Sequence, residues 1–114
     1  MRGVEEFFYR LVTEGNLALD PLVFDEVLYV SKKKYGVKYE DTIDFLDRVV
    51  LPASVVLPIT RKDYERAKEI IVGNDLKPSD ALHVAVMLNN SIRRIVSEDR
   101  ELDRVKGIER VWLS

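Results

Sequence analysis

The chain has 114 residues, of which 46% are apolar and 33% are charged, and this composition predicts one globular domain over residues 1–114. It has no cysteine and one histidine, which excludes disulfides, thiolate sites and histidine-based metal cages, so a bound metal would be carboxylate-held Mg²⁺ or Mn²⁺. There is no run of about 18 apolar residues and no signal-peptide pattern, which predicts a cytoplasmic protein with no membrane partner.

Apolar residues at helical spacing predict three helices in the first half of the chain. The first spans Val4–Val12 and is closed by Gly15. The second follows an Asp20-Pro21 start signal and runs to about Lys34, with Gly36 past its end. The third carries apolar residues from Tyr39 to Val50. The segment Leu17–Leu19 is too short to be predicted as a strand with certainty.

Strands and helices alternate in the second half. Val55–Ile59 is a strand-length apolar run that Pro58 shortens or places at a sheet edge. Thr60 and Asp63 form a capping box for a helix that Gly73 is expected to stop. The segment Ser79–Leu88 is apolar almost all round, which predicts a buried helix. Two further strands are expected, over Ile92–Ser97 and Ile108–Leu113. This alternation predicts an α/β fold with a mainly parallel sheet.

Two acidic positions lie where elements of this fold begin and end. Asp80 is in the first turn of the buried helix, and Asp99 and Glu101 follow the strand after it. The intervening chain is long enough for the helix to run antiparallel to the strand, so helix start and strand end meet, where ligands bind in such sheets. Each acid also has a structural interpretation, because Asp80 complements the helix dipole and Asp99 can cap the segment Arg100–Val105.

Several other polar residues have both a structural and a functional interpretation. Glu26 lies in an otherwise apolar helix, so it either faces water or belongs to a site, because an unpartnered buried carboxylate is costly. Ser97 is either an ordinary strand-end residue or a hydroxyl beside the acids. A buried core role is favoured for His83. For Lys32–Lys34, a favourable interaction with the helix dipole is preferred over phosphate contacts.

The segments Asp80-Ala81-Leu82 and Ser97-Glu98-Asp99-Arg100-Glu101-Leu102 resemble the PIN-domain ribonucleases, which include the VapC toxins. The family pattern reads D-A-L and then T-x-D-x-D-F, so this chain has Ser for Thr, Glu for the second Asp and Leu for Phe. Asp25-Glu26-Val27-Leu28 is similar to the acidic helix that the family has upstream.

The resemblance implies a three-layer PIN-like fold, with a mainly parallel central sheet flanked by helices. It also implies Mg²⁺- or Mn²⁺-dependent hydrolysis of RNA phosphodiesters, including a role as the toxin of a toxin–antitoxin pair. The implied metal-site acids are Glu26, Asp80 and Asp99, with Glu101 as a supporting catalytic residue. We expect the carboxyl groups of Glu26, Asp80 and Asp99 to lie roughly 4–9 Å apart, as hydrated divalent ions require.

One part of the family pattern has no match in this chain, the first strand that ends in D-T-N and supplies the first catalytic Asp. We therefore expect weak or no ribonuclease activity from the chain as given, and the alternative function is a catalytically inactive PIN-like binding or scaffold module. A sheet without that strand also predicts a homodimer, burying on the order of 1,200–2,000 Å² through a face with Phe7, Phe8 and Leu11. An antitoxin-like protein is the other expected partner.

Overall fold

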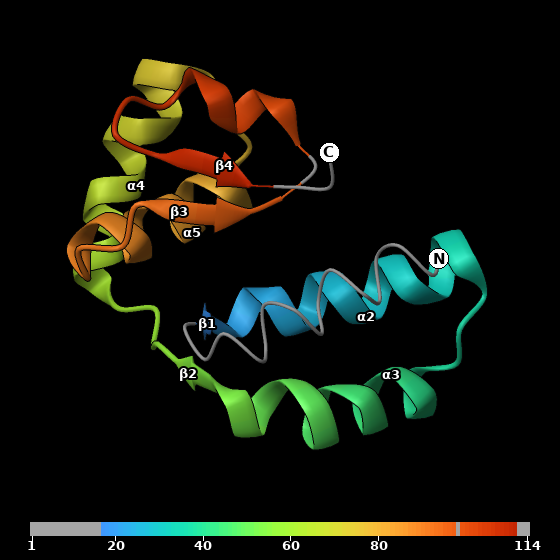
Figure 1. Cartoon of the computed structure of the whole chain (residues 1–114). Helices are drawn as coiled ribbons and strands as arrows, with labels where there is room; N and C mark the ends of the chain where they lie inside the picture. The colour runs from blue at the N-terminus through green and yellow to red at the C-terminus, as the bar shows by residue number, and fades with distance from the viewer. Residues whose placement is uncertain (1–16, 98, 112–114) are drawn as a thin grey trace. The chain divides into compact units, whose positions relative to one another are not determined.

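A computed structural model describes residues 17–97 and 99–111. The chain forms two compact units, which divide after Leu57, and Figure 1 shows the elements of each. The helix expected over Val4–Val12 lies outside the described residues, as do Phe7, Phe8 and Leu11. Among the described residues, no helix is both long enough and apolar enough to cross a membrane.

In its described part, residues 17–57, the first unit contains two short strands with helical segments between them. Its elements are β1 (Leu17–Leu19), α2 (Pro21–Tyr35), α3 (Tyr39–Phe45), a π-helical turn (Leu46–Val50), a 3₁₀ turn (Leu51–Ala53) and β2 (Ser54–Val56). The two strands pair in parallel, and the Leu57 amide extends the ladder by donating to the Leu19 carbonyl at 2.7 Å. The segment Leu17–Leu19 is therefore a strand, which its three residues alone did not allow us to predict.

The signals at both ends of α2 were predicted correctly. The Asp20 carboxylate accepts the Leu22 amide at 3.0 Å, and Pro21 is the first helical residue. Gly36 takes a left-handed conformation with φ of 69° and donates its amide to the Lys32 carbonyl at 3.0 Å. A residue without a side chain adopts this conformation at little cost, which is why the helix ends here.

The expectation of one helix over Tyr39–Val50 was only partly right. The α-helix ends at Phe45, and the chain passes through the π-helical and 3₁₀ turns before β2. Pro52 has no amide hydrogen and its ring crowds the preceding turn, so a regular α-helix cannot continue past it.

The described residues of the second unit form two packed helices and a pair of strands. Its elements are α4 (Arg61–Asn74), α5 (Pro78–Asn89), β3 (Arg94–Val96), the 3₁₀ helix η3 (Arg100–Arg104) and β4 (Glu109–Val111). Strands β3 and β4 lie side by side and are parallel (Figure 1). The parallel pairing expected from the sequence is thus confirmed in both units, although β2 and β3 are shorter than predicted.

A buried cluster holds the second unit together. Its members come from α4, α5, η3 and the connections between them: Ala67, Ile70, Leu76, Ala81, Val84, Ala85, Leu102 and Val105. Helices α4 and α5 pack directly against each other. Leu102 is 1% exposed, so η3 is anchored in the core by its middle residue. This anchor fixes the loop after β3.

The start of α4 was predicted correctly, and its end was not. The Thr60 amide and hydroxyl both donate to Asp63 Oδ2, at 2.8 and 2.9 Å, which completes the capping box. The helix continues through Gly73 to Asn74, and Asp75 takes the left-handed conformation at φ of 53°. One glycine costs a helix only about 1 kcal/mol, and Ile70 lies in the core on the same helix, so Gly73 does not end it.

Candidate functional site

Asp80 lies in the first turn of α5 and faces partly inward. The helix starts at Pro78, a residue suited to this position because its missing amide hydrogen would have no partner there. Asp80 is half-buried, and its Oδ2 atom is buried. The next residue, Ala81, is 0% exposed, so the helix start is fixed against the core. The expected position of Asp80 at the mouth of a buried helix is what the structure shows.

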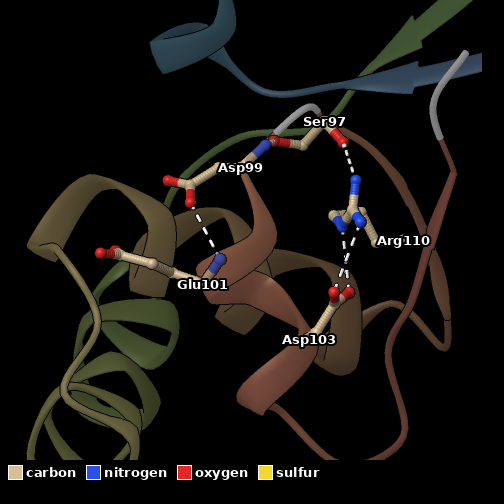
Figure 2. Close-up of polar contacts among 5 residues, drawn as sticks. All are labelled: Ser97, Asp99, Glu101, Asp103 and Arg110. Atoms are coloured by element: carbon tan, nitrogen blue, oxygen red, sulfur yellow. Dashed lines mark hydrogen bonds and ion pairs between the residues drawn. The ribbon is translucent and has the colours of Figure 1, made fainter.

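Asp99 follows β3 and begins η3, and hydrogen bonds hold it on both sides. Its amide donates to the Ser97 hydroxyl at 3.1 Å. Its Oδ1 atom accepts the Glu101 amide at 2.9 Å, as an N-cap does (Figure 2). The capping role considered for Asp99 is therefore present. It occupies one carboxylate oxygen and fixes the direction of the other.

Three carboxylates meet at this point of the second unit. Asp80, Asp99 and Glu101 each offer one oxygen, and these oxygens all lie within 4.8 Å of one another. All three side chains are half-buried. Like charges at such distances repel, and a divalent cation among them removes the repulsion. The donor set, all carboxylate oxygen, suits Mg²⁺ or Mn²⁺.

A lysine side chain borders this acidic cluster. Lys77, the residue before α5, has its Nζ atom 3.7 Å from Asp99 Oδ2. The side chains are 67% and 29% exposed, so the pair is solvated and contributes little to stability. It partly offsets the negative charge of the cluster.

Glu26 is not part of the described cluster. It is half-buried on α2 in the first unit, whereas Asp80, Asp99 and Glu101 are all in the second. Its role as a fourth acid, and its distance from the other three, stay predictions.

The remaining polar residues have structural contacts. Ser97 orders the turn through its hydroxyl, and His83 is buried in α5, as expected. Lys32, Lys33 and Lys34 are in the last turn of α2. Each ammonium group lies over a tyrosine ring, and the shortest of these contacts joins Lys32 to Tyr39 at 4.2 Å. Their expected position at the carboxyl end of a helix is confirmed.

Arg110 is a residue near the site that the sequence reasoning did not identify. It lies on β4 and contacts both Asp103 and the Ser97 carbonyl. A charged side chain inside a predicted strand of mostly apolar residues was the signal that could have marked it. Asp103, its carboxylate partner, is 56% exposed.

Comparison with known proteins identifies similar sequences and folds. The family model described as PIN domain matches residues 4–108. "VapC ribonuclease Mb1869c" of Mycobacterium bovis is 35% identical over 106 residues, which cover 90% of this chain and 81% of that protein. "Ribonuclease VapC13" of Mycobacterium tuberculosis matches to the same extent. A chain from the solved "Toxin-antitoxin complex from Klebsiella pneumoniae" has a similar fold, with a TM-score of 0.60 at 21% identity over 80% of this chain and 70% of that one.

Proposed function

Because this chain belongs to the PIN-domain family, we propose that it is a divalent-metal-dependent ribonuclease of the VapC type. The observation that carries the proposal is the cluster of Asp80, Asp99 and Glu101, whose oxygens lie within 4.8 Å of one another. The two Mycobacterium relatives are both named as VapC ribonucleases. RNA is therefore the proposed substrate.

Each acid has a distinct part in the proposed site. Asp80 and Asp99 would hold the ion, with Glu26 as a further ligand, and Glu101 would support them. A bound Mg²⁺ or Mn²⁺ would supply an activated water and offset the charge that develops on the phosphate oxygens. The cap between Asp99 Oδ1 and the Glu101 amide holds the Asp99 carboxylate in one orientation. Lys77 would contribute positive charge where a phosphate approaches.

A cleavage assay tests the proposal. The wild-type chain should cut single-stranded RNA when Mg²⁺ or Mn²⁺ is supplied, weakly as expected from the sequence, and cleavage should stop when EDTA is added. Asp99→Asn should lower the rate by about 100-fold or more, since even the partners that orient metal ligands are worth about 10- to 100-fold. Asp75→Asn is the matched control, because it removes the same charge at an exposed position and asparagine tolerates the left-handed conformation.

The assay also separates this function from its alternative. A wild-type chain that binds Mn²⁺ but leaves RNA intact would favour a PIN-like binding module. A chain that neither binds Mn²⁺ nor cuts RNA would contradict the proposed site itself.

We also propose protein partners, namely an antitoxin and a second copy of this chain. An apolar pocket of about 390 Å³ in the first unit supports a protein partner. It is lined by Asp47 and by apolar side chains: Phe24, Leu28, Ile43, Leu46, Leu51 and Val56. Ile43 and Val56 are 45% and 42% exposed, and exposed apolar surface of this kind marks interaction sites.

The two partners have separate tests. Light scattering at tens of micromolar should give the mass of a dimer, and a monomer at that concentration would contradict the homodimer. Co-expression with the product of an adjacent gene should yield a complex if that product is the antitoxin. Ile43→Glu should weaken that complex, whereas Asp44→Glu on the same helix should not.

A further inference from the structure

One arginine ties together both ends of the loop that carries two of the clustered acids. Arg110 donates from Nε and Nη2 to the two carboxylate oxygens of Asp103, at 3.0 and 3.3 Å. It donates from Nη1 to the Ser97 carbonyl at 3.2 Å. Figure 2 shows these contacts on one side of the loop, with the carboxyl groups of Asp99 and Glu101 on the other. We call these contacts the Arg110 clamp.

The contacts of the clamp fix the orientation of the Arg110 guanidinium as well as pairing its charge. A planar guanidinium that binds a carboxylate through two parallel hydrogen bonds has a fixed orientation. Its third donor then reaches a backbone carbonyl at a fixed place. The Arg110 side chain is 19% exposed, whereas Asp103 is 56% exposed, so the buried part of the clamp is the guanidinium with its bond to the Ser97 carbonyl.

The position of the clamp in the chain connects it to the acidic cluster. Ser97 is the residue after β3, and Asp103 lies in the last part of η3. Asp99 and Glu101 lie between them, and the hydrogen bonds of Arg110 go to Asp103 and Ser97 on either side. The buried Leu102 and Val105 hold η3 to the core through apolar contacts. The Arg110 clamp adds polar contacts at Ser97 and Asp103, on both sides of Asp99 and Glu101 in the chain.

We propose that Arg110 is a positioning residue, which holds the segment Ser97–Asp103 so that the oxygens of Asp99 and Glu101 meet that of Asp80. The inference rests on the proposed metal-dependent function. The competing explanation is an ordinary ion pair that contributes only to stability. The two explanations predict opposite changes in cation affinity when Arg110 is replaced.

Removal of a positive charge near a cation site should strengthen cation binding if electrostatics alone acts. Loss of a positioning contact should weaken it. We therefore expect Arg110→Ala to weaken Mn²⁺ binding about 10-fold, at the low end of effects seen for groups that orient metal ligands. Arg110→Lys keeps the charge but cannot make the paired contact, so it should also weaken binding.

Arg94→Ala is the matched control. Arg94 is on the partner strand β3, and its Nε atom lies 3.7 Å from Glu109 in a pair that is 70% and 66% exposed. Its removal takes one positive charge from the same strand pair and leaves the Arg110 clamp intact. Mn²⁺ affinity should be unchanged or slightly higher. The measurement is a titration with Mn²⁺ alone. Binding is monitored by calorimetry or by the electron paramagnetic resonance signal of the free ion.

A second measurement does not depend on metal. The Glu101 amide, which donates to Asp99 Oδ1, should exchange its hydrogen with solvent faster in Arg110→Ala, while core amides such as that of Ala85 keep their protection. If the Ala85 amide also loses protection, the Arg110→Ala variant has unfolded. The same two measurements on Arg110→Lys then test the inference. Unchanged or tighter Mn²⁺ binding, with unchanged Glu101 exchange, would overturn the inference. A wild-type chain that binds no Mn²⁺ would contradict the proposed function, and faster Glu101 exchange would then still support the clamp as the residue that orders the loop.

Discussion

Lys77 and Asp99 come from different elements, and their side chains meet at the edge of the acidic cluster, with Nζ 3.7 Å from Oδ2. The lysine lies beside the carboxylate oxygen that does not accept the Glu101 amide. Its ammonium group therefore repels a cation that binds the cluster. This repulsion has a measurable consequence.

Lys77→Met should tighten Mn²⁺ binding about twofold to fivefold. An exposed ion pair is worth about 0.2–1 kcal/mol, and that amount no longer opposes the incoming cation. Titration of the RNA-free protein with Mn²⁺ measures the change. Lys106→Met, at another exposed lysine of the second unit, is the control and should bind as the wild type does. Weaker binding by Lys77→Met would mean that Lys77 helps to shape the site.

The three clustered acids should differ in their importance for metal binding. Asp80→Asn should reduce Mn²⁺ affinity by about 10- to 100-fold, because Asp80 Oδ2 is buried and water cannot easily replace it. Glu101→Gln should have a smaller effect, as expected for a supporting residue. Thermal unfolding with and without Mn²⁺ checks this, since ligand stabilisation grows with the ratio of free metal to its dissociation constant. Equal losses in both variants would contradict the ranking.

The carboxyl group of Asp63 should make stability depend on pH. Burial alone would raise the pKa of Asp63, but hydrogen bonds from Asn89 and Thr60, together with the nearby Lys62, outweigh it and hold that pKa below its ordinary value of 3.8. Because folding lowers this pKa, the contribution to stability is complete above about pH 4 and is lost as the pH falls through the folded value. Asp63→Asn should remove this acid-dependent loss.

Asp63→Asn should also lower the free energy of unfolding by about 1–2 kcal/mol at neutral pH, which is the usual effect of a lost helix cap. Urea unfolding at a series of pH values measures both effects. Glu69→Gln, exposed on the same helix, is the control and should follow the wild-type curve. Parallel curves for Asp63→Asn and the wild type would show that Asp63 does not titrate as argued.

Two glycines should respond to alanine in opposite directions. Neither Gly36 nor Gly73 has an atom within 4 Å of where a Cβ would lie, so steric contact plays no part. Gly36 has φ of 69°, and an alanine there should cost about 1–2 kcal/mol. Gly73 is inside α4, where alanine should stabilise the fold by about 0.5–1 kcal/mol. Urea midpoints check the signs, and a loss of stability in Gly73→Ala would mean that α4 ends before it.

The sequence by itself determined the features that depend on neighbours a few positions away. The Asp20 cap, the Thr60–Asp63 capping box and the Gly36 helix end were all predicted, because each is completed by hydrogen bonds within one helical turn. The placement of Asp80 at a helix start and of Asp99 after a strand followed from the same local patterns, and the resemblance to a family added their proposed chemistry.

Only the tertiary structure decided the features that depend on distant partners. Leu17–Leu19 is a strand because Ser54–Val56 pairs with it, and no property of three residues encodes that partner. Helix α4 continues past Gly73 because packing of residues such as Ile70 outweighs one unfavourable residue. Arg110 contacts Asp103 and Ser97 only because β4 returns beside β3. Contacts of this kind join residues that are far apart in the sequence and form only when the chain folds. A short segment of sequence therefore does not predict them.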